Sequence, residues 1–349
     1  MFKKSSVMLL VGVLLGTLLL SACGEKKEEK KSESKEKTPI GVQLSWIDTI
    51  EFIDFYAADA QGYYDEAGLA VTTHRGGFDE QGNYIDPVTR VLNGEVQFGV
   101  KAAADILAAR AEGKPVVAIA SIYQRSPASI VSLGESNITQ PADLVGKRVM
   151  VEFGTNLTAL YFAFLASEGI ERSDIIEVVN EGHVVDPLLN GEVDAYLGFI
   201  TNESLQVKHR AQGEVNDLFL SDYGVDTYVN CIFTTEDMIK NNPDLVEAFL
   251  RATLRGAEWA VANPDQAAEL VVERFGDQLP DTVKELQKEA MQASLPLLKP
   301  AGSELGMMQP AVWEFTQQML LDQGTLSEPV DLDQAYTLEF LNKIYQQAQ

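Results

Sequence analysis

The sequence predicts an α/β fold with two lobes, and three observations support this prediction. Apolar strand-like runs alternate with helical patterns from Thr38 to about Tyr228. Residues 86–96 and 186–193 both contain Asp-Pro followed by Leu-Asn-Gly-Glu-Val, which reads as a short helix, a turn and the start of a strand. From Asn242 onward the pattern is helical. A repeated strand-and-helix unit of this kind predicts two lobes with the same topology, lying side by side.

The first unit covers residues 41–77 and reads as strand, turn, helix, turn and strand. The apolar run 40–46 has the length of a buried strand. Asp48 followed by Glu51 fits a capping box, which predicts that a helix begins there. That helix is expected to end at Gly62, before a second strand.

Trp46 and Asp48 occupy the turn after the first strand. In a strand–helix–strand unit this turn lies at the carboxyl edge of the sheet, where open α/β folds bind ligands. Both residues are therefore candidates for ligand contact. The alternative also stands at this point: Trp46 can cover the core, and Asp48 can do no more than cap the helix.

The composition allows two domains and excludes one class of partner. The chain has 349 residues, of which 46% are hydrophobic, and 52 Asp and Glu oppose 27 Lys and Arg. The formal net charge of -25 repels nucleic acid, so nucleic-acid binding is not expected. We interpret the acidity as a solvated surface that keeps the protein soluble.

The amino end has the pattern of a targeting segment. Basic residues precede the apolar run 7–20, which leads into Leu-Ser-Ala-Cys ending at Cys23. This resembles a bacterial lipobox, so we expect residues 1–22 to be removed as a signal peptide and Cys23 to carry a lipid. Residues 23–37 form a polar tether before the fold begins at Thr38. The expected location is the extracytoplasmic face of the cell membrane, with the lipid as the only membrane attachment.

The remaining elements follow in order. The first lobe is expected to comprise residues 38–125 and, after the chain returns, residues 225–349. The second lobe is expected to comprise residues 126–224. Further strands are predicted at 96–100, 116–122, 129–133, 148–152, 175–179 and 195–200. Helices of the carboxyl-terminal part are predicted at 244–261, 265–275, 281–293, 310–323 and 332–347, packed on the first lobe, the first two capped by Asn242 and Asn263.

Candidate binding groups gather where predicted strands end. Gly154, Thr155 and Asn156 open a helix directly after a strand, where backbone amides can bind a ligand, although plain N-capping explains the same residues. Segments 100–105 and 198–203 occupy matching positions in the two lobes. Aromatic and amide side chains near these edges are Trp46, Tyr123, Gln124, Tyr223 and Tyr228. Because Lys101 and Arg125 are the basic residues there, a flat heteroaromatic ligand is favoured over a highly charged anion.

No motif in the sequence supports catalysis. The chain lacks GxSxG, HExxH and P-loop patterns, and His74, His183 and His209 are far apart. Cys231 is the only Cys besides Cys23 and lies in an apolar run, so we expect a buried thiol and no disulfide. We expect no cofactor and no metal site.

Taken together, several motifs resemble the ABC-transporter solute-binding lipoproteins related to the fungal thiamine-pyrimidine synthases. The likeness extends over nearly the whole mature chain. It rests on the lipobox, Ser45-Trp46, residues 55–58, Gly62-Tyr63-Tyr64, Gly68-Leu69, the stretch 93–100, and 242–265 with its two Asn-Pro pairs.

The resemblance implies a two-lobed type II periplasmic-binding-protein fold, closing like a hinge on a ligand in the cleft between the lobes. Members bind formylaminopyrimidine or riboflavin, and residues 77–87 resemble the flavin importers more, so riboflavin is favoured and formylaminopyrimidine is the alternative. Carried over by position, the expected ligand contacts are Trp46, Asp48, Tyr56, Asp105, Gly154, Thr155, Asn156 and Asn202.

The resemblance also implies partners: a membrane permease and a separate ATPase, with the binding protein itself a monomer. An enzyme is the alternative of another class, since the fungal relatives are synthases that use pyridoxal phosphate on a lysine and a Cys/His-rich segment. This chain has no such segment. A role as a sensor or adhesin is a third alternative.

Overall fold

The computed structural model describes residues 37–153, 155–180 and 184–347. The predicted signal peptide, Cys23 and all of the predicted tether except Lys37 lie outside the described residues, as do Gly154 and His183.

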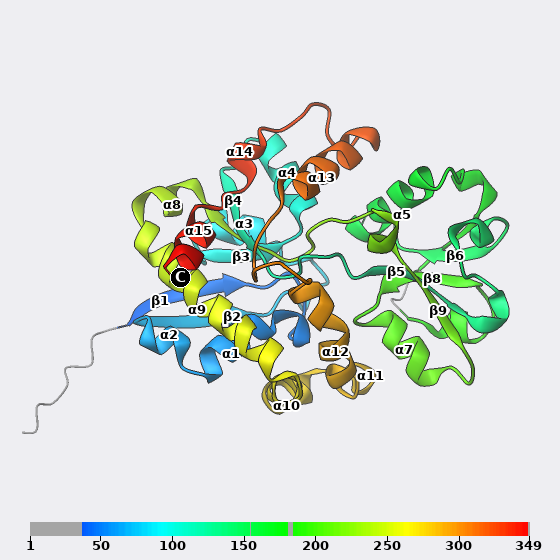
Figure 1. The fold of residues 1–349 in the computed structure, drawn as a ribbon, viewed down its shortest axis with the longest axis horizontal. Coiled ribbons are helices and arrows are strands. Elements are labelled where there is room, and N and C mark those ends of the chain that lie inside the picture. The colour runs from blue at the N-terminus through cyan, green and yellow to red at the C-terminus, as the bar shows by residue number, and fades with distance from the viewer. Residues whose placement is uncertain (1–36, 154, 181–183, 348–349) are drawn as a thin grey trace, which may run out of the picture. The chain divides into compact units, whose positions relative to one another are not determined.

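Five strands form the first sheet, in the order β2-β1-β3-β10-β4 (Figure 1). Their bounds are β1 Thr38–Gln43, β2 Leu69–His74, β3 Phe98–Lys101, β4 Val116–Ser121 and β10 Cys231–Thr235. Strands β2, β1 and β3 run parallel, whereas β10 is antiparallel to both β3 and β4. The central strands are buried on both faces, which explains why they read as continuous apolar runs.

The second sheet repeats this arrangement, in the order β7-β6-β8-β5-β9. Its bounds are β5 Ala128–Leu133, β6 Arg148–Val151, β7 Ile176–Val179, β8 Ala195–Phe199 and β9 Val215–Phe219. Here β5 is the strand that runs antiparallel to its neighbours β8 and β9. Each sheet therefore receives its antiparallel strand from a segment that crosses over from the other sheet, and the prediction of two units with the same topology is confirmed.

Helices of the first unit are α1 Ile53–Ala60, α2 Tyr63–Glu66, α3 Pro87–Leu92 and α4 Ala103–Ala111, and those of the second are α5 Asn156–Ser167, α6 Asp186–Leu189 and α7 Glu203–Arg210. The α5 face with Leu160, Phe164 and Leu165 is buried. Short 3-10 turns are η1 Ile50–Phe52, η2 Gly134–Ser136, η3 Pro141–Leu144, η4 Arg172–Asp174, η5 Leu220–Tyr223 and η6 Gly276–Gln278.

The carboxyl-terminal helices pack largely on the first sheet's unit, as predicted. They are α8 Glu236–Asn241, α9 Pro243–Ala262, α10 Pro264–Phe275, α11 Asp281–Lys284, α12 Gln287–Leu298, α13 Pro310–Asp322, α14 Leu332–Ala335 and α15 Glu339–Gln346. Helix α9 lies against α1 and α2, while α13 lies against α4 and also reaches α5. The ring of Phe249 on α9 stacks on Phe98 of β3 with centroids 3.9 Å apart, which joins helix and sheet in one core.

Several local predictions were wrong. The capping box at Asp48 and Glu51 does not form: Thr49 precedes the 3-10 turn η1, and α1 begins only at Ile53. Asn242 and Asn263 precede Pro at the start of α9 and α10, yet neither side chain caps its helix. The helices predicted at 281–293 and 332–347 are each divided in two, and β9 and α7 were not predicted.

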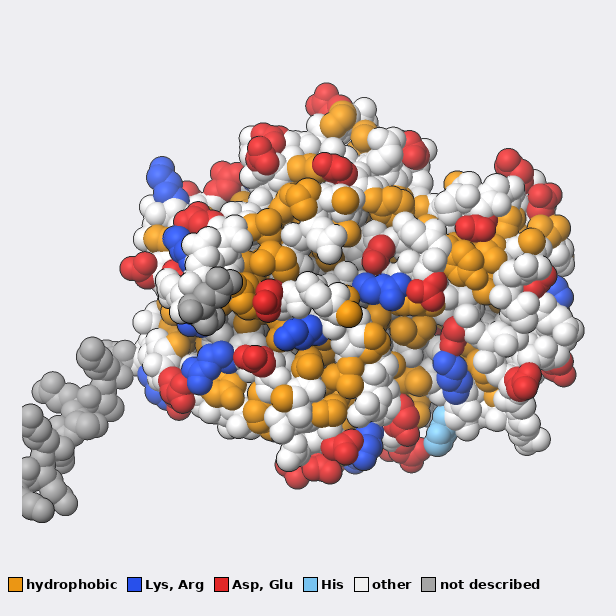
Figure 2. Space-filling model, viewed as in Figure 1, with side chains coloured by type: hydrophobic (Ala, Val, Ile, Leu, Met, Phe, Trp, Pro, Cys, Tyr) orange, Lys and Arg blue, Asp and Glu red, His pale blue; other side chains and the backbone are white. Residues whose placement is uncertain are grey.

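Acidic side chains are scattered over the face of the molecule seen in Figure 2 and do not gather in one patch. This distribution fits the interpretation of the acidity as a solvated surface. Cys231 is buried, as predicted, and burial raises the pKa of its thiol. Among the described helices, none has both the length and the apolar character needed to cross a membrane.

Candidate functional site

Both sheets have a switch point at which successive strands are added on opposite sides. In the first sheet β1 is followed by β2 on one side, and β3 lies on the other side of β1; β6, β7 and β8 repeat this order in the second sheet. Open α/β sheets bind ligands beyond the carboxyl ends of the strands at such points. The described candidates that lie in the segments following these strands are Trp46, Asp48, Asp105, Thr155, Asn156 and Asn202.

Three aromatic rings gather beside the end of β1, and we call Trp46, Phe78 and Tyr84 the aromatic cluster. The Trp46 and Phe78 rings meet edge to face with centroids 5.8 Å apart, and Phe78 and Tyr84 do the same at 5.8 Å. All three side chains are exposed, by 37%, 55% and 38% respectively. Large apolar side chains exposed together in a polar surface indicate a place that another molecule covers.

The loop after β2 holds the cluster in place. Phe78 and Tyr84 pair as an antiparallel bridge, and between them the Asp79 carboxylate accepts from the backbone amides of Gln81 and Asn83 at 2.9 and 2.8 Å. These hydrogen bonds, that of Asn83 first, hold the pKa of Asp79 below its usual range. At Gly76 an added Cβ would lie 2.3 Å from the Leu44 carbonyl oxygen. Only glycine therefore allows the loop to lie so close to the β1 turn.

Lys101, at the end of β3, contacts the cluster through Tyr84. Its ammonium group donates to the Tyr84 hydroxyl at 3.1 Å and lies 4.4 Å from the centre of the same ring. The Tyr84 hydroxyl in turn donates to the Ser45 carbonyl at 3.0 Å. Lys101 also lies 3.8 Å from the Asp105 carboxylate, and its side chain is only 14% exposed. Its charge is therefore engaged in the protein, as a cation over an aromatic face and in an ion pair.

Asp48 and Tyr56 form a buried pair beneath this turn. The Tyr56 hydroxyl donates to Asp48 Oδ1 at 2.8 Å. Asp48 is 5% exposed and Tyr56 only 1%, with its ring 4.6 Å from that of Phe275. Burial, reinforced by the Asp48 charge, raises the pKa of Tyr56 well above its usual value. The structure thus places Tyr56 in the core, where it fixes Asp48 and the turn that carries Trp46.

Asn156 and Thr155 begin helix α5 after β6. The Thr155 hydroxyl accepts from the Thr158 amide at 3.3 Å, so Thr155 caps the helix, which was the alternative considered for it. The Asn156 side chain donates instead to Asp105 Oδ2 on α4 at 3.2 Å. The structure therefore brings together two predicted site residues that lie beside different sheets.

Asn202 follows β8, and its amide is engaged locally. Its nitrogen donates to Glu203 Oε1 at 2.7 Å, and its oxygen accepts from Gln206 at 3.0 Å. The other Glu203 oxygen accepts from the Phe199 amide at 2.9 Å. Asn202 and Glu203 thus fix the turn at the carboxyl end of β8.

Glu51 is a candidate that sequence reasoning interpreted only as a helix cap. Its side chain is half-buried in η1, and burial raises the pKa of its carboxyl group to about 7. The Asn230 side chain opposes this shift, and the charge of Glu203 adds to it. Phe78 and Tyr84 were not predicted as site residues, although residues 77–87 resemble the flavin importers. The signal available in the sequence was a pair of aromatic residues on both sides of an Asp-Glu-Gln-Gly-Asn turn.

Three other residues predicted near the site lie in the interior. Tyr123 is 2% exposed and shares a hydrogen bond of 2.7 Å with the Ser294 hydroxyl. Tyr228 is 1% exposed, and its hydroxyl accepts from the Gln309 amide at 2.7 Å. Gln124 is also buried. These side chains support the edges of the sheets and do not line an open surface.

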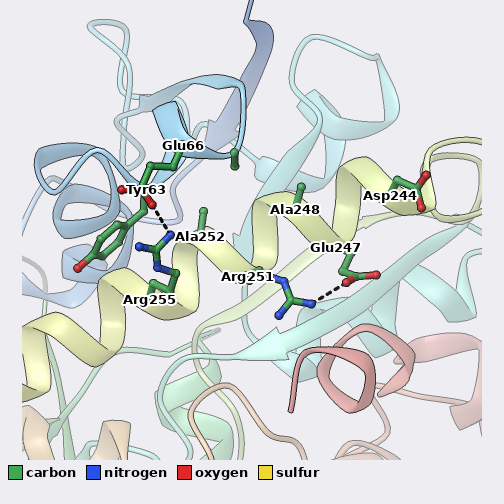
Figure 3. A pocket seen from close by; sticks show the side chains of 9 residues that line it. Tyr63, Glu66, Asp244, Glu247, Ala248, Arg251, Ala252 and Arg255 are labelled. Carbon is green, nitrogen blue, oxygen red and sulfur yellow. Dashed lines mark hydrogen bonds and ion pairs between the residues drawn. The ribbon is translucent and has the colours of Figure 1, made fainter. Parts of the chain in front are cut away.

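A separate hollow of about 440 Å³ lies between α2 and α9 (Figure 3). Both arginines of this hollow are paired. Arg255 forms an ion pair with Glu66 at 2.7 Å, and its guanidinium lies 3.9 Å from the centre of the Tyr63 ring. Arg251 forms an ion pair with Glu247 at 2.7 Å. Helix α2 leads into the start of β2, so this hollow lies at the amino edge of the sheet, opposite the predicted site residues. In the described parts of the chain, no group of three or more His, Cys, Asp or Glu could hold a metal ion.

Three curated relatives align with most of the chain. The riboflavin-binding protein RibY of Chloroflexus aurantiacus is 29% identical, covering 95% of this chain and 97% of its own. A formylaminopyrimidine-binding protein of Halalkalibacterium halodurans is 24% identical, covering 94% and 97%. A 4-amino-5-hydroxymethyl-2-methylpyrimidine phosphate synthase of Legionella pneumophila is 27% identical, covering 88% and 94%.

Among solved structures, a putative periplasmic sulfonate-binding protein SsuA from Methylobacillus flagellatus superposes with a TM-score of 0.69, at 15% identity, over 90% of this chain and 95% of its own. With the two sheets of matching topology, this confirms the predicted two-lobed α/β fold of periplasmic binding proteins. The NMT1/THI5-like family matches residues 49–267, more than half of the chain. The chain therefore belongs to the NMT1/THI5-like family.

Proposed function

We propose that this protein is the extracytoplasmic solute-binding component of an ABC importer and that it captures a flat heteroaromatic vitamin, riboflavin in the first place. The observation that carries the proposal is the exposed aromatic cluster at the switch point of the first sheet. Trp46, Phe78 and Tyr84 present three ring surfaces to solvent within one small area. Covering such rings with a planar ligand removes apolar surface from water and adds stacking contacts.

Two cations beside the cluster are already engaged within the protein, which favours a neutral ring over an anion; Arg75, exposed just before the loop, is the cation on which an anion would have to rely. Lys101 is engaged with Tyr84 and Asp105, and the Arg90 guanidinium donates to Gln43 at 2.5 Å and to Glu95 at 2.9 Å. A sulfonate or nitrate would need cations available to pair with it. The likeness to a sulfonate-binding structure is therefore taken as a likeness of fold, and the ligand is argued from the site.

Delivery would require two further proteins. We expect a membrane permease to receive the ligand and a separate ATPase to drive transport, with the binding protein acting as a monomer. The lipobox-like Leu-Ser-Ala-Cys ending at Cys23 supports attachment to the membrane by a lipid, and the binding proteins among the relatives support the transport role.

Formylaminopyrimidine is the second candidate ligand, because a relative of nearly equal coverage is named for binding it. Its smaller ring would cover less of the aromatic cluster than the three fused rings of a flavin. The synthases in the family make an enzyme the alternative of another class. With two Cys and three His in the whole sequence, the chain lacks the Cys/His-rich segment expected of the fungal enzymes.

The proposal is tested by isothermal titration of the purified full-length protein with riboflavin and, separately, with formylaminopyrimidine. Micromolar or tighter binding of riboflavin and weaker binding of the pyrimidine are expected. Tight binding of the pyrimidine alone would instead assign the protein to thiamine salvage. Absence of heat with both compounds would contradict the proposed ligand class.

A further inference from the structure

Glu51 lies where the carboxyl edges of the two sheets approach one another. It follows β1, whereas Tyr123 follows β4, and Asn230 precedes the antiparallel β10, so all three belong to the same edge of the first sheet. Glu203 follows β8 at the carboxyl edge of the second sheet. Glu51 interacts electrostatically with Glu203 and with Tyr123, and the Asn230 side chain, whose buried amide nitrogen has no hydrogen-bond partner among the described residues, lowers the pKa of the Glu51 carboxyl group. This position is the one at which open α/β folds place their ligands.

The backbone around Glu51 is held firmly. The Ile50 amide donates to the side-chain oxygen of Gln287 on α12 at 2.8 Å. Ile50 and Phe52 are 3% and 1% exposed, so the residues on both sides of Glu51 are packed in the core. A polar side chain fixed between two buried neighbours has few directions open to it, which pre-organises its carboxyl group.

The surroundings of Glu51 favour its neutral form. Burial is the largest influence and raises the pKa of its carboxyl group to about 7, Glu203 raises it further, and Asn230 opposes the shift. The other titratable groups coupled to it are Asp54 on α1 and Tyr123. Among the described groups that influence Glu51, none is a cation. Near neutral pH a large fraction of the molecules therefore carry Glu51 as a carboxylic acid.

Structural roles do not account for this arrangement. Glu51 does not cap η1, whose N-cap residue Thr49 makes no side-chain capping hydrogen bond, and it does not cap α1. A half-buried acid whose charge is opposed by its neighbours destabilises the fold at neutral pH. Such groups occur preferentially at binding and active sites.

We propose that the Glu51 carboxyl group reads the hydrogen-bonding edge of the ligand ring. A neutral carboxyl group offers one O–H donor and one C=O acceptor side by side. It therefore complements a heterocycle edge on which an N–H lies next to a carbonyl oxygen or a ring nitrogen. Flavins and aminopyrimidines both present such an edge. This inference rests on the proposed function and adds to it the residue that selects the ligand by its hydrogen bonds.

A pH dependence follows from this pairing. As pH rises through about 7, Glu51 loses its O–H, and two acceptors then face the acceptor on the ring. Because only the neutral form makes both hydrogen bonds, the apparent affinity falls with the fraction of neutral Glu51. Between pH 6 and pH 8.5 this fraction, and with it the affinity, should fall about 30-fold for a pKa of about 7.

The test is the affinity of the full-length protein for riboflavin at pH 6, 7 and 8.5, measured for the wild type, Glu51→Gln and Glu51→Ala. Glutamine keeps one donor and one acceptor at every pH, so Glu51→Gln should bind as tightly as the wild type at pH 6 and keep that affinity at pH 8.5. Glu51→Ala should bind about tenfold or more weakly at pH 6. Glu289→Gln changes an exposed acid on α12 and should follow the wild-type curve.

The series separates this inference from the proposed function. If Glu51→Gln and Glu51→Ala both bind riboflavin with the affinity and the pH dependence of the wild type, the inference about Glu51 fails and the proposed function stands. A pH dependence in Glu51→Gln equal to that of the wild type would overturn it too, because the titrating group would lie elsewhere. If the wild type binds neither riboflavin nor formylaminopyrimidine at any of the three pH values, the proposed ligand class fails and this inference fails with it.

Discussion

The side-chain amide of Asn156 donates to the Asp105 carboxylate over 3.2 Å. Asn156 begins α5 after β6 of the second sheet, and Asp105 lies on α4 after β3 of the first. The hydrogen bond thus joins the carboxyl edges of the two sheets. Through the Asp105–Lys101 and Lys101–Tyr84 contacts it is continuous with the aromatic cluster.

Replacing Asn156 with alanine should weaken riboflavin binding. If this hydrogen bond stabilises the arrangement in which both edges face the ligand, its loss of about 0.5–1.5 kcal/mol lowers the affinity by about two- to tenfold. The measurement is isothermal titration at constant salt. Asn190→Ala, which changes an exposed Asn in the same lobe, is the control. Equal affinities of Asn156→Ala and the control would show that the bond plays no part in binding.

Phe78 offers a test of the aromatic cluster that hardly affects folding. Because its side chain is 55% exposed, Phe78→Ala should leave the thermal midpoint nearly unchanged while reducing riboflavin affinity by about tenfold. Val145→Ala alters an equally exposed apolar side chain, 53% exposed, that lies before the start of β6, and serves as the control. Loss of affinity in the control but not in Phe78→Ala would contradict the assignment of the cluster.

Gly256 tests the close contact between α9 and α1. A Cβ at this position would lie 2.2 Å from the Asp54 carbonyl oxygen and 2.6 Å from the Ala58 nitrogen, both backbone atoms. Gly256→Ala should therefore lower the free energy of unfolding by about 2 kcal/mol, despite the better helix propensity of alanine. Gly213→Ala, in open space, should change it by less than about 0.5 kcal/mol. Urea denaturation measures both, and equal stabilities would show that the helices separate without cost.

Asp54 predicts how stability depends on pH. Its side chain is buried on α1, and burial raises the pKa of its carboxyl group from 3.8 to about 8, with a further contribution from Glu51. Since the folded protein holds this proton more tightly than the unfolded chain, stability should decrease as pH rises from about 4 to about 8.

Asp54→Asn removes this contribution, so its stability relative to the wild type should improve between pH 5 and pH 8 in urea denaturation. Glu51 is coupled to Asp54, so the comparison reports the titration of Asp54 together with the change that its removal causes in Glu51. Asp237→Asn, at an exposed position of α8, should show no such change. A stability difference between Asp54→Asn and the wild type that is the same at both pH values would refute the assignment.

The fold could be predicted from sequence because its signals are local and repeated. The Leu-Asn-Gly-Glu-Val repeats end α3 and α6 and lead to β3 and β8, which occupy equivalent places in the two sheets. Pro243 and Pro264 begin α9 and α10 as expected, since a proline at the first helical position needs no hydrogen-bonded amide.

The site was only partly predictable, because its decisive contacts are long-range. Asp48 and Glu51 match a capping box in sequence. In the structure, however, the Tyr56 hydroxyl donates a hydrogen bond to the Asp48 carboxylate, and the segment forms a 3-10 turn. The positions of Phe78 and Tyr84 beside Trp46 depend on the fit of Gly76 against the Leu44 carbonyl, 32 residues away in the sequence. No local pattern encodes such an approach.

The central claim is that the aromatic cluster around Trp46 holds the ligand ring. It is tested most directly by the riboflavin affinity of Trp46→Ala, measured beside the wild type and beside Tyr63→Ala, which alters a ring at the amino edge of the sheet. We expect affinity to fall at least tenfold in Trp46→Ala and to stay unchanged in Tyr63→Ala. Wild-type affinity in a folded Trp46→Ala protein would contradict the account.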